Sequence, residues 1–508
     1  MNITAQSLIT SLTEILGSFA FLGPELMLAL FFLLIVALDL FKSKLIKAAL
    51  PWVALSGILI SLISQIYFLN NNQAKQAKLF FSGLLITDGL ALYAGLLFSV
   101  AGILTIVLSV LSKQLQLKFS GRGEYYAYIL VLLAGLNLMA KSVNLLMLFV
   151  ALELVSIGSY LLTTAIKRQQ DAMESGLKYI LYGTLASGVM LYGMSFLYGF
   201  GGSLSFLDTA FWANLSRLDS PFFLVIFLLT FAGFLFKIAA APFHFWAPDV
   251  YEGAPTPIVA FFATAPKIAG FVVIIRFLLQ IKNNLATTLQ DDVMLLVGGI
   301  SLLSLVIGNF TALWQSRARR LLAYSSVAHA GFLLAALAAL ATNSIEAVLF
   351  YLSVLLFMNF GIFLLVQVFE ERLQIFDIKG LAGQGKTYPL LGVLAIIILI
   401  SLTGLPPTAG FTSKLLLFTN IWQNYSATGN QLLLTLLLVG LLLTGVAFFY
   451  YIRIPYFLFF KRNLNPEKKV VLGREDIVLA FISFPLLLFF FQPAWLTELI
   501  RQVVLYSK

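Results

Sequence analysis

Five ionisable residues lie near the middle of long apolar stretches of this sequence. They are Glu153 in LFVALELVSIG, Lys237 in AGFLFKIAAAP, Lys267 in FFATAPKIAGF, His329 in YSSVAHAGFLL and Lys414 in AGFTSKLLLF. A charged side chain at the centre of a bilayer costs at least about 2.5–3.5 kcal/mol, so it must be paired, hydrated or neutral. We therefore expect all five side chains to face the interior of a helix bundle.

The chemistry of this set suits proton transfer. Burial favours the neutral form of a lysine, and a nearby carboxylate favours the charged form, so moving the carboxylate or its proton switches the lysine. Glu153 and Lys237 are the expected pair, Lys267 follows, His329 relays a proton and Lys414 closes the line. For any one of these lysines a structural ion pair explains the position equally well, and for His329 alone a packing role is the better explanation. The prediction rests on the whole set.

Other ionisable residues carry a structural interpretation. Glu25, Asp39, Asp88 and Arg453 lie nearer the ends of apolar stretches, where a long side chain can reach the polar interface. His244 lies beside an expected helix break, where it can satisfy freed backbone groups.

The octapeptide GLAGQGKT at 380–387 fits the phosphate-binding pattern G-x-x-x-x-G-K-[ST], through Gly380, Gly385, Lys386 and Thr387. A working loop of this kind needs a strand before it and a helix after it within an α/β domain. Here the preceding IFDI is short and isolated, and an apolar span follows directly. We expect no nucleotide at 380–387, which removes the main support for an ATP-driven transporter.

The composition requires a membrane. The chain has 508 residues, of which 60% are hydrophobic and 11% are charged, whereas soluble domains have about 45–50% apolar and about 25% charged residues. It contains no cysteine and only two histidines, so it cannot hold a thiolate-bound iron–sulfur cluster or structural zinc. We expect no metal and no cofactor in this chain. The net charge of +10 is explained by basic loops, and we expect no nucleic-acid partner.

Fourteen apolar runs are long enough to span a bilayer, which takes about 20 residues as a helix. They lie near 18–41, 48–69, 84–112, 124–140, 144–166, 176–198, 221–243, 256–280, 292–313, 321–341, 345–369, 389–422, 431–459 and 475–495. Backbone groups in hydrocarbon must pair internally, so these runs predict an all-α polytopic membrane protein.

Two of the spans contain helix-breaking residues. The seventh contains Ala239-Ala240-Ala241-Pro242, and the twelfth contains Gly404-Leu405-Pro406-Pro407-Thr408-Ala409-Gly410. Paired breaks in corresponding positions indicate an ion pathway, although a proline kink explains either break alone. Their separation by five spans predicts two inverted five-helix repeats. The expected layout is three N-terminal helices (1–113), a first repeat of spans 4–8 (124–281), a second repeat of spans 9–13 (290–460) and a C-terminal helix (474–508).

Basic residues predict the orientation. Most of the Lys and Arg residues between spans fall in odd-numbered loops, such as Arg317, Arg319 and Arg320 in the ninth. By the positive-inside rule these loops are cytoplasmic, and both termini lie on the outer side.

Several motifs then resemble one family. FKIAAAPFHFWAPDVYEGAPTPIVAFFATAPKIAGF (236–271) is similar to the signature region of the subunit N family of bacterial NADH:quinone oxidoreductase, respiratory complex I. ESGLKYILYGTLASGVMLYG (174–193), LLAYSSVAHAGFLL (321–334) and LTGLPPTAGFTSKLLLF (402–418) support the match. The related subunits L and M, and multisubunit cation/proton antiporters, typically lack the DVYEGAPTP and APK wording.

The resemblance implies a proton-translocating subunit of the membrane arm, with a proton path through the positions of Glu153, Lys237, Lys267, His329 and Lys414. It also implies that NADH, FMN, iron–sulfur clusters and quinone are used by other subunits of the complex. The antiporter-like subunit M and the small subunits K and J are the expected neighbours, in the inner membrane of a bacterium. The alternative is a subunit of a multisubunit Na⁺(K⁺)/H⁺ antiporter.

Overall fold

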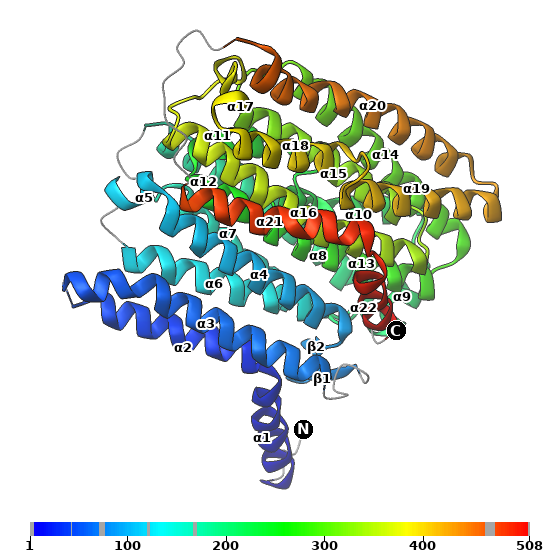
Figure 1. Ribbon diagram of the computed structural model, residues 1–508. Helices are drawn as coiled ribbons and strands as arrows, with labels where there is room; N and C mark the ends of the chain where they lie inside the picture. The colour runs from blue at the N-terminus through cyan, green and yellow to red at the C-terminus, as the bar shows by residue number, and fades with distance from the viewer. Residues whose placement is uncertain are drawn as a thin grey trace.

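The computed structural model describes residues 5–41, 43–70, 77–118, 122–165, 170–462 and 473–505. Nearly all of this is helix, in a bundle whose long members run side by side (Figure 1). Within these ranges the only paired strands are β1 (Lys78–Phe80) and β2 (Leu85–Thr87), a short antiparallel hairpin. The predicted all-α membrane class is confirmed.

The helices alternate between long spans and short connectors. The first part of the chain contains α1 (Ala5–Ser18), the 3-10 turn η1 (Phe19–Leu22), α2 (Gly23–Asp39), α3 (Lys44–Asn70), α4 (Gly89–Leu111), α5 (Lys113–Lys118), α6 (Arg122–Lys141), α7 (Leu145–Thr163), α8 (Gln170–Gly201) and α9 (Thr209–Leu215). The middle contains α10 (Ser220–Ile238), α11 (Trp246–Gly253), α12 (Thr256–Phe262), α13 (Ala265–Asn284), α14 (Thr287–Leu313), α15 (Ala318–Leu337) and α16 (Thr342–Glu371). The last part contains η3 (Ile378–Leu381), α17 (Gln384–Thr387), α18 (Pro389–Thr403), α19 (Ala409–Thr428), α20 (Gln431–Phe460), α21 (Arg474–Phe491) and α22 (Ala494–Leu505).

Twelve helical segments of the described chain are long and apolar enough to cross a membrane. The number is thirteen if α21 and α22, which meet at an angle of 82°, count as one span. The predicted twelfth span is divided between α18 and α19, and α18 alone is a shorter apolar helix. The count of fourteen therefore stays a prediction, although the positions of the individual helices agree closely with the predicted runs.

The loops separate into two sets at opposite ends of the bundle. One end of the bundle contains the connectors α5, α11 and α17, which belong to predicted odd-numbered loops or to the breaks beside them (Figure 1). The opposite end contains α9, α22 and the β hairpin. Both chain ends lie toward the second end. This arrangement agrees with the predicted sharing of one membrane side by the odd loops.

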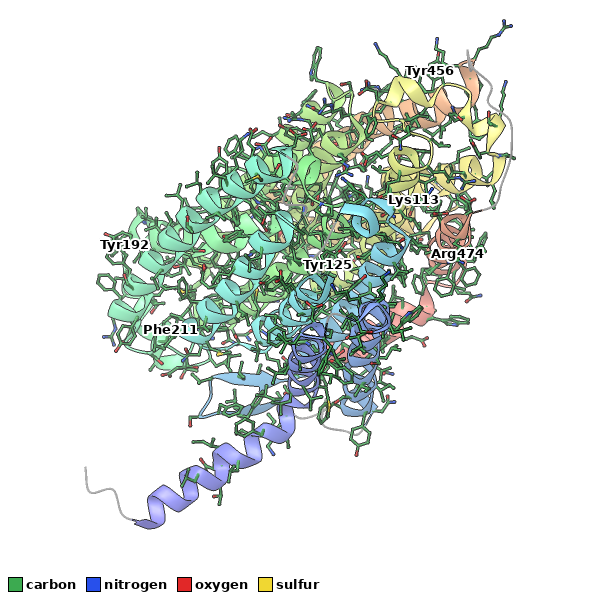
Figure 2. All side chains as sticks on the ribbon, turned by 90° about the vertical axis from the view of Figure 1, so that its left-hand side faces the viewer. Lys113, Tyr125, Tyr192, Phe211, Tyr456 and Arg474 are labelled. Atoms are coloured by element: carbon green, nitrogen blue, oxygen red, sulfur yellow. The ribbon has the colours of Figure 1, made fainter. Side chains whose placement is uncertain are left out.

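Burial divides the bundle into a centre and a periphery. In the most apolar stretch of α12–α13 every residue is buried, and in that of α16 94% of the residues are buried. In the corresponding stretches of α2 and α3 only about a quarter of the residues are buried. Helix α1 projects away from the rest of the molecule in both views (Figures 1 and 2). The central helices are thus the ones that can isolate charged side chains from lipid.

Polar side chains begin several of these helices. Asp88 accepts a hydrogen bond from the amide of Ala91 at the start of α4, and Asn144 accepts from Leu146 and Met147 at the start of α7. Each cap satisfies amides that the helix itself leaves unpaired, a strong requirement near hydrocarbon.

Candidate functional site: a buried line of charged residues

The five predicted residues lie on five central helices, α7, α10, α13, α15 and α19. Lys237, Lys267, His329 and Lys414 are each at most 4% exposed, and Glu153 is half-buried. The expectation that they face the bundle interior is therefore confirmed for the lysines and the histidine, which neither lipid nor bulk water reaches.

The first predicted break follows Lys237 directly. Helix α10 ends at Ile238, and Ala239 adopts a left-handed conformation with φ of 56°. The amide of Ala240 donates to the carbonyl of Leu235 at 2.9 Å, and the amide of Ala241 donates to Ser304 Oγ of α14 at 2.9 Å. Protein groups thus satisfy the backbone that the break releases, as irregular backbone at membrane depth requires.

Lys237 has no hydrogen-bond partner in the described part of the chain, although its ammonium group is buried. Glu153 forms no ion pair with it within 4 Å. Three further buried polar atoms near this break or near Glu153 also lack partners: Glu153 Oε1, Tyr160 OH and His244 Nδ1. The side chains of the predicted pair, Glu153 and Lys237, therefore do not contact each other directly.

A second interruption, before Lys267, was not predicted. Helix α12 ends at Phe262 and α13 begins at Ala265, and between them Asn359 of α16 donates from Nδ2 to the carbonyl of Ala263 at 2.9 Å. Pro266 is the one sequence signal for it, because a proline cannot donate to the preceding turn. The predicted eighth span is consequently two helices, with Lys267 in the first turn of the second.

Lys267 contacts one hydroxyl group, which in turn contacts a second. Its Nζ donates to the carbonyl of Ser326 at 2.9 Å and also contacts Ser326 Oγ. Tyr251 OH lies 3.2 Å from the same Ser326 Oγ. Neither residue was predicted, although both lie inside the motifs that carry the family resemblance.

His329 joins three helices. Its Nδ1 lies 2.6 Å from Tyr351 OH of α16, and its Nε2 lies 3.2 Å from Tyr451 OH of α20. With one ring nitrogen a donor and the other an acceptor, a neutral imidazole satisfies both contacts. The two tyrosines were missed because long-range partners of this kind leave no local pattern in the sequence.

The second predicted break lies beside Lys414. Helix α18 ends at Thr403, Gly404 has φ of 85°, and α19 begins at Ala409. Lys414 Nζ donates to the carbonyl of Thr403 at 2.7 Å and lies 4.8 Å from the ring centre of Phe332. A cation and an aromatic face attract each other at this distance.

One face of α15 links the three residues of this half. Ser326, His329 and Phe332 follow one another at intervals of three, which places them on the same side of a helix. Ser326 contacts Lys267, His329 contacts the two tyrosines, and Phe332 contacts Lys414. Helix α15 therefore contributes a neighbour to Lys267 and to Lys414 and carries His329 between these two neighbours.

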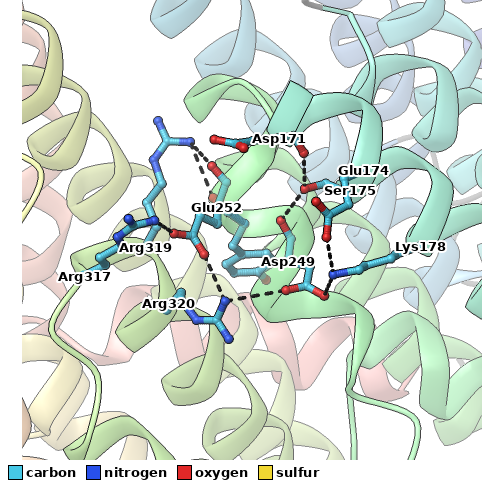
Figure 3. Close-up of polar contacts among 10 residues, drawn as sticks. Asp171, Glu174, Ser175, Lys178, Asp249, Glu252, Arg317, Arg319 and Arg320 are labelled. Carbon is cyan, nitrogen blue, oxygen red and sulfur yellow. Dashed lines mark hydrogen bonds and ion pairs between the residues drawn. The ribbon is translucent and has the colours of Figure 1, made fainter. Parts of the chain in front are cut away.

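The end of α11 is held by a network of charges (Figure 3). Glu252 binds Arg317 and, at 3.0 Å, Arg320, while Asp249 lies 3.6 Å from Arg320 and 3.1 Å from Lys178. Burial alone would raise the pKa of the Glu252 carboxyl, but the two arginines outweigh burial and hold that pKa below its usual value. The network fixes the short helix that connects Lys237 to Lys267.

A cavity of about 560 Å³ opens beside this network, at the end where the odd-numbered loops meet. Its lining comes from several such loops and includes Asp171, Glu252, Arg317, Arg319 and Glu370. Arg319 closes one side by binding Glu370 and the carbonyl of Ala254, the latter at 2.9 Å. The cavity is lined by Glu252, the residue that follows the fully buried Tyr251 in the chain.

Two acidic residues near span ends are buried, although we expected their side chains to reach the polar interface. Glu25 is 5% exposed and lies 2.7 Å from Lys141, and Asp88 is 1% exposed and binds Arg276 through two contacts of 2.7 Å. The structural role is consistent with these pairs, but the prediction that the side chains reach the interface is wrong for both. A partner on another helix, which sequence order does not reveal, makes burial tolerable.

The octapeptide 380–387 folds as part of η3, a left-handed Gly383 and the single turn α17. The amide of Gly383 donates to the carbonyl of Phe457 at 3.0 Å, which docks the loop on α20. This geometry differs from the strand, loop and helix of a phosphate-binding loop. Within the described ranges no group of three or more acidic or histidine side chains could hold a metal ion.

Comparison with known proteins agrees with this architecture. Residues 142–444 match the family described as NADH:quinone oxidoreductase/Mrp antiporter, TM. NADH-quinone oxidoreductase subunit N of Chlorobium chlorochromatii is 37% identical over 454 residues, covering 89% of this chain and 86% of the relative.

Solved structures give the same result. A chain of respiratory complex I from Thermus thermophilus has a TM-score of 0.75 and 28% identity, covering 94% of this chain and 98% of that chain. A chain of the Mrp complex from Dietzia has a TM-score of 0.80 at 17% identity, covering 95% and 96%, and shows a shared fold alone. The chain therefore belongs to the NADH-quinone oxidoreductase subunit N family.

Proposed function

We propose that this chain translocates protons across the membrane as a subunit of an NADH:quinone oxidoreductase, along the line formed by Glu153, Lys237, Lys267, His329 and Lys414. The observation that carries the proposal is the face of α15, where Ser326 contacts Lys267, His329 contacts Tyr351 and Phe332 contacts Lys414, with all of these side chains buried. Isolated structural ion pairs would not need this alignment on one helix.

The first half of the line is suited to a switch. Lys237 has no fixed acceptor, and a carboxylate that approaches it would favour its protonated form, the role that we assign to Glu153. Buried polar atoms in proteins are nearly always hydrogen-bonded to protein or water. The four atoms without protein partners near the first break therefore mark where water molecules complete a path between Glu153 and Lys237.

The second half is suited to a relay. A neutral Lys267 can take the proton of Ser326 Oγ while Ser326 takes the proton of Tyr251 OH, and Tyr251 then regains a proton from the side of the cavity. The hydroxyls of Tyr351 and Tyr451 on the two nitrogens of His329 allow a proton to arrive on one nitrogen and leave from the other. Lys414 receives it beside the carbonyl of Thr403.

The antiporter alternative has weaker support. The fold is shared with the Mrp complex, but identity to that structure is 17%, whereas curated subunit N relatives reach 34–38%. We infer that the complex also contains the subunits that use NADH, FMN, iron–sulfur clusters and quinone, and that subunits M, K and J are neighbours of this chain.

We place the complex in the inner membrane of a bacterium, with the cavity end of the bundle toward the cytoplasm and both chain ends outside. We further propose that residues 124–281 and 290–460 are inverted repeats. Support comes from the two left-handed breaks, at Ala239 and Gly404, each of which lies within eleven residues of a buried lysine.

The test is the replacement of Lys237 by alanine in membranes in which native gels show that the complex assembles. NADH-driven proton uptake should fall at least tenfold. Exposed Lys461, at the end of α20, provides the control: its replacement by alanine should leave uptake unchanged. Wild-type uptake in the Lys237 variant would contradict the assigned role.

A further inference from the structure

A separate cavity of about 230 Å³ lies at the odd-loop end of the bundle, away from the buried line. It is formed by the start of α3, the end of α4, the connector α5 and the start of α6, and Tyr125 on its α6 side is labelled in Figure 2. The residues that matter for its chemistry are Lys47, Trp52, Gln116, Tyr125 and Tyr126. Sites that enclose a whole small molecule are typically about 300–1,000 Å³, so this cavity suits a smaller group.

The walls of the cavity are built from buried and fixed side chains. Tyr125 and Tyr126 are nearly buried, and Tyr125 OH lies 2.7 Å from Ser109 Oγ of α4. Gln116 of α5 donates to the carbonyl of Val110 and so fixes the connector over the opening. Pro51 lies within α3 and has no amide to donate, which leaves the carbonyl of Lys47, four residues earlier, without its usual helical partner.

Lys47 supplies an unpaired positive charge. It is half-buried at the cavity, and it forms no ion pair with any residue that the structure describes. The neighbouring segments contain the basic residues Lys44 and Lys113 and the acidic residues Asp39 and Glu124. Glu371 also reaches this end, where its carboxylate accepts from Ser112 Oγ and from the amide of Lys113. None of these acids lines the cavity.

The depth and the neighbours of the cavity select its occupant. Trp52, five residues after Lys47 on α3, lines the same cavity and is 64% exposed. Tryptophan and tyrosine gather at the level of lipid headgroups, and basic pockets between membrane helices on the cytoplasmic side bind anionic headgroups. A phosphate at Lys47 would leave the attached acyl chains along Trp52 and the apolar outer face of α3.

We propose that this cavity binds the headgroup of one anionic phospholipid, with Lys47 as the phosphate partner and Trp52 beside the first carbons of its chains. The site is independent of the proton path. It joins α3, which is otherwise lightly buried, to the rest of the bundle through a lipid.

The experiment measures the quenching of Trp52 fluorescence by brominated lipids. The intact complex is placed in nanodiscs that contain dibrominated phosphatidylglycerol or dibrominated phosphatidylcholine at the same mole fraction. The signal of Trp52 is the difference between each protein and its Trp52→Phe form. Phosphatidylglycerol should quench Trp52 with about fivefold higher apparent affinity, as expected for one basic residue near anionic lipid, worth about 1 kcal/mol.

Two variants distinguish binding of the anionic lipid at Lys47 from its general attraction to the basic loop. Lys47→Ala should reduce the preference to about one, whereas Lys44→Ala, which removes an equal charge from the same loop but outside the cavity, should retain most of it. Equal quenching by both lipids in the unmodified complex would overturn the proposal, as would equal losses in the two variants. The absence of quenching by either lipid would show that a neighbouring protein covers the site and would also overturn it.

Discussion

The two halves of the buried line differ in the hydrogen bonding of their ionisable side chains. Near the first break, Glu153, Tyr160, Lys237 and His244 each have a buried polar atom without a hydrogen bond in the described chain. Beyond it, Lys267, His329 and Lys414 each contact a hydroxyl or a carbonyl within 3.2 Å. A charge held by fixed dipoles keeps its environment through the cycle, whereas a charge without fixed partners depends on a neighbour that can change. On this basis we propose the first half as the switch and the second half as the relay.

The two helix breaks also differ in the residue that adopts the left-handed conformation. Ala239 occupies a left-handed position that costs a residue with a Cβ about 1–2 kcal/mol, whereas Gly404 occupies the second at little cost. In the second break the fit is tight: a Cβ on Gly410 would lie 1.8 Å from the carbonyl oxygen of Ser401. The second break therefore leaves no room for an added side-chain atom at Gly410, and such a change should reduce assembly of the complex.

The largest effect is expected for Gly410→Ala. The added methyl group meets backbone that cannot move without shifting α18, and overpacking of this kind costs about 1–3 kcal/mol or more. The amount of assembled complex on native gels should fall severalfold. Gly445→Ala in α20, where nothing lies within 4 Å of the new Cβ, should assemble normally; equal assembly of both variants would contradict the rigid second break.

Glu153→Gln should have the next largest effect. The change keeps the shape of the side chain but removes the charge that favours protonated Lys237. NADH-driven proton uptake should fall about tenfold or more in complex that still assembles. Glu498→Gln, in an exposed position of α22, should retain full uptake, and a similar loss in both variants would remove the special position of Glu153.

The tyrosines of the relay should give moderate and unequal effects. Tyr351→Phe removes the 2.6 Å contact to His329, and Tyr451→Phe removes the 3.2 Å contact. A hydrogen bond contributes about 0.5–1.5 kcal/mol, which corresponds to a reduction in uptake of about two- to tenfold. The loss should be greater for Tyr351, as judged by initial rates of uptake at equal amounts of complex. Two fully active variants would show that the hydroxyls do not carry the proton.

Phe332→Leu should give the smallest effect. It removes the aromatic face at Lys414 but preserves the apolar volume and the bond to Thr403. Because Lys414 keeps its carbonyl acceptor, uptake should fall less than in either tyrosine variant. A loss as large as that of Glu153→Gln would mean that the second half is no less sensitive than the first.

Sequence reasoning located the helices and the charged residues well, because both depend on local patterns. Apolar length and helix-breaking residues identify spans, and a charge inside such a span is visible without a structure. The partners were not visible: Ser326, Tyr351 and Tyr451 are ordinary residues until the fold brings them to Lys267 and His329. Burial of Glu25 with Lys141, and of Asp88 with Arg276, likewise depends on contacts between distant helices.

The break between α12 and α13 shows the same limit in the backbone. Pro266 alone does not distinguish a kink from an interruption, and the amide of Asn359, 93 positions later in the chain, stabilises the freed carbonyl of Ala263. Packing thus decides where a membrane helix can be open, while the sequence indicates only where it is weak.

The central claim is that Lys267 exchanges protons with its neighbours along the face of α15. The most direct test is the rate of NADH-driven proton uptake by inverted membrane vesicles that contain Lys267→Ala, measured together with NADH oxidation and with assembly on native gels. We predict that the Lys267→Ala complex assembles and that its rate of proton uptake is at least tenfold below that of the unmodified complex. Uptake at the unmodified rate, with unmodified NADH oxidation, would contradict it.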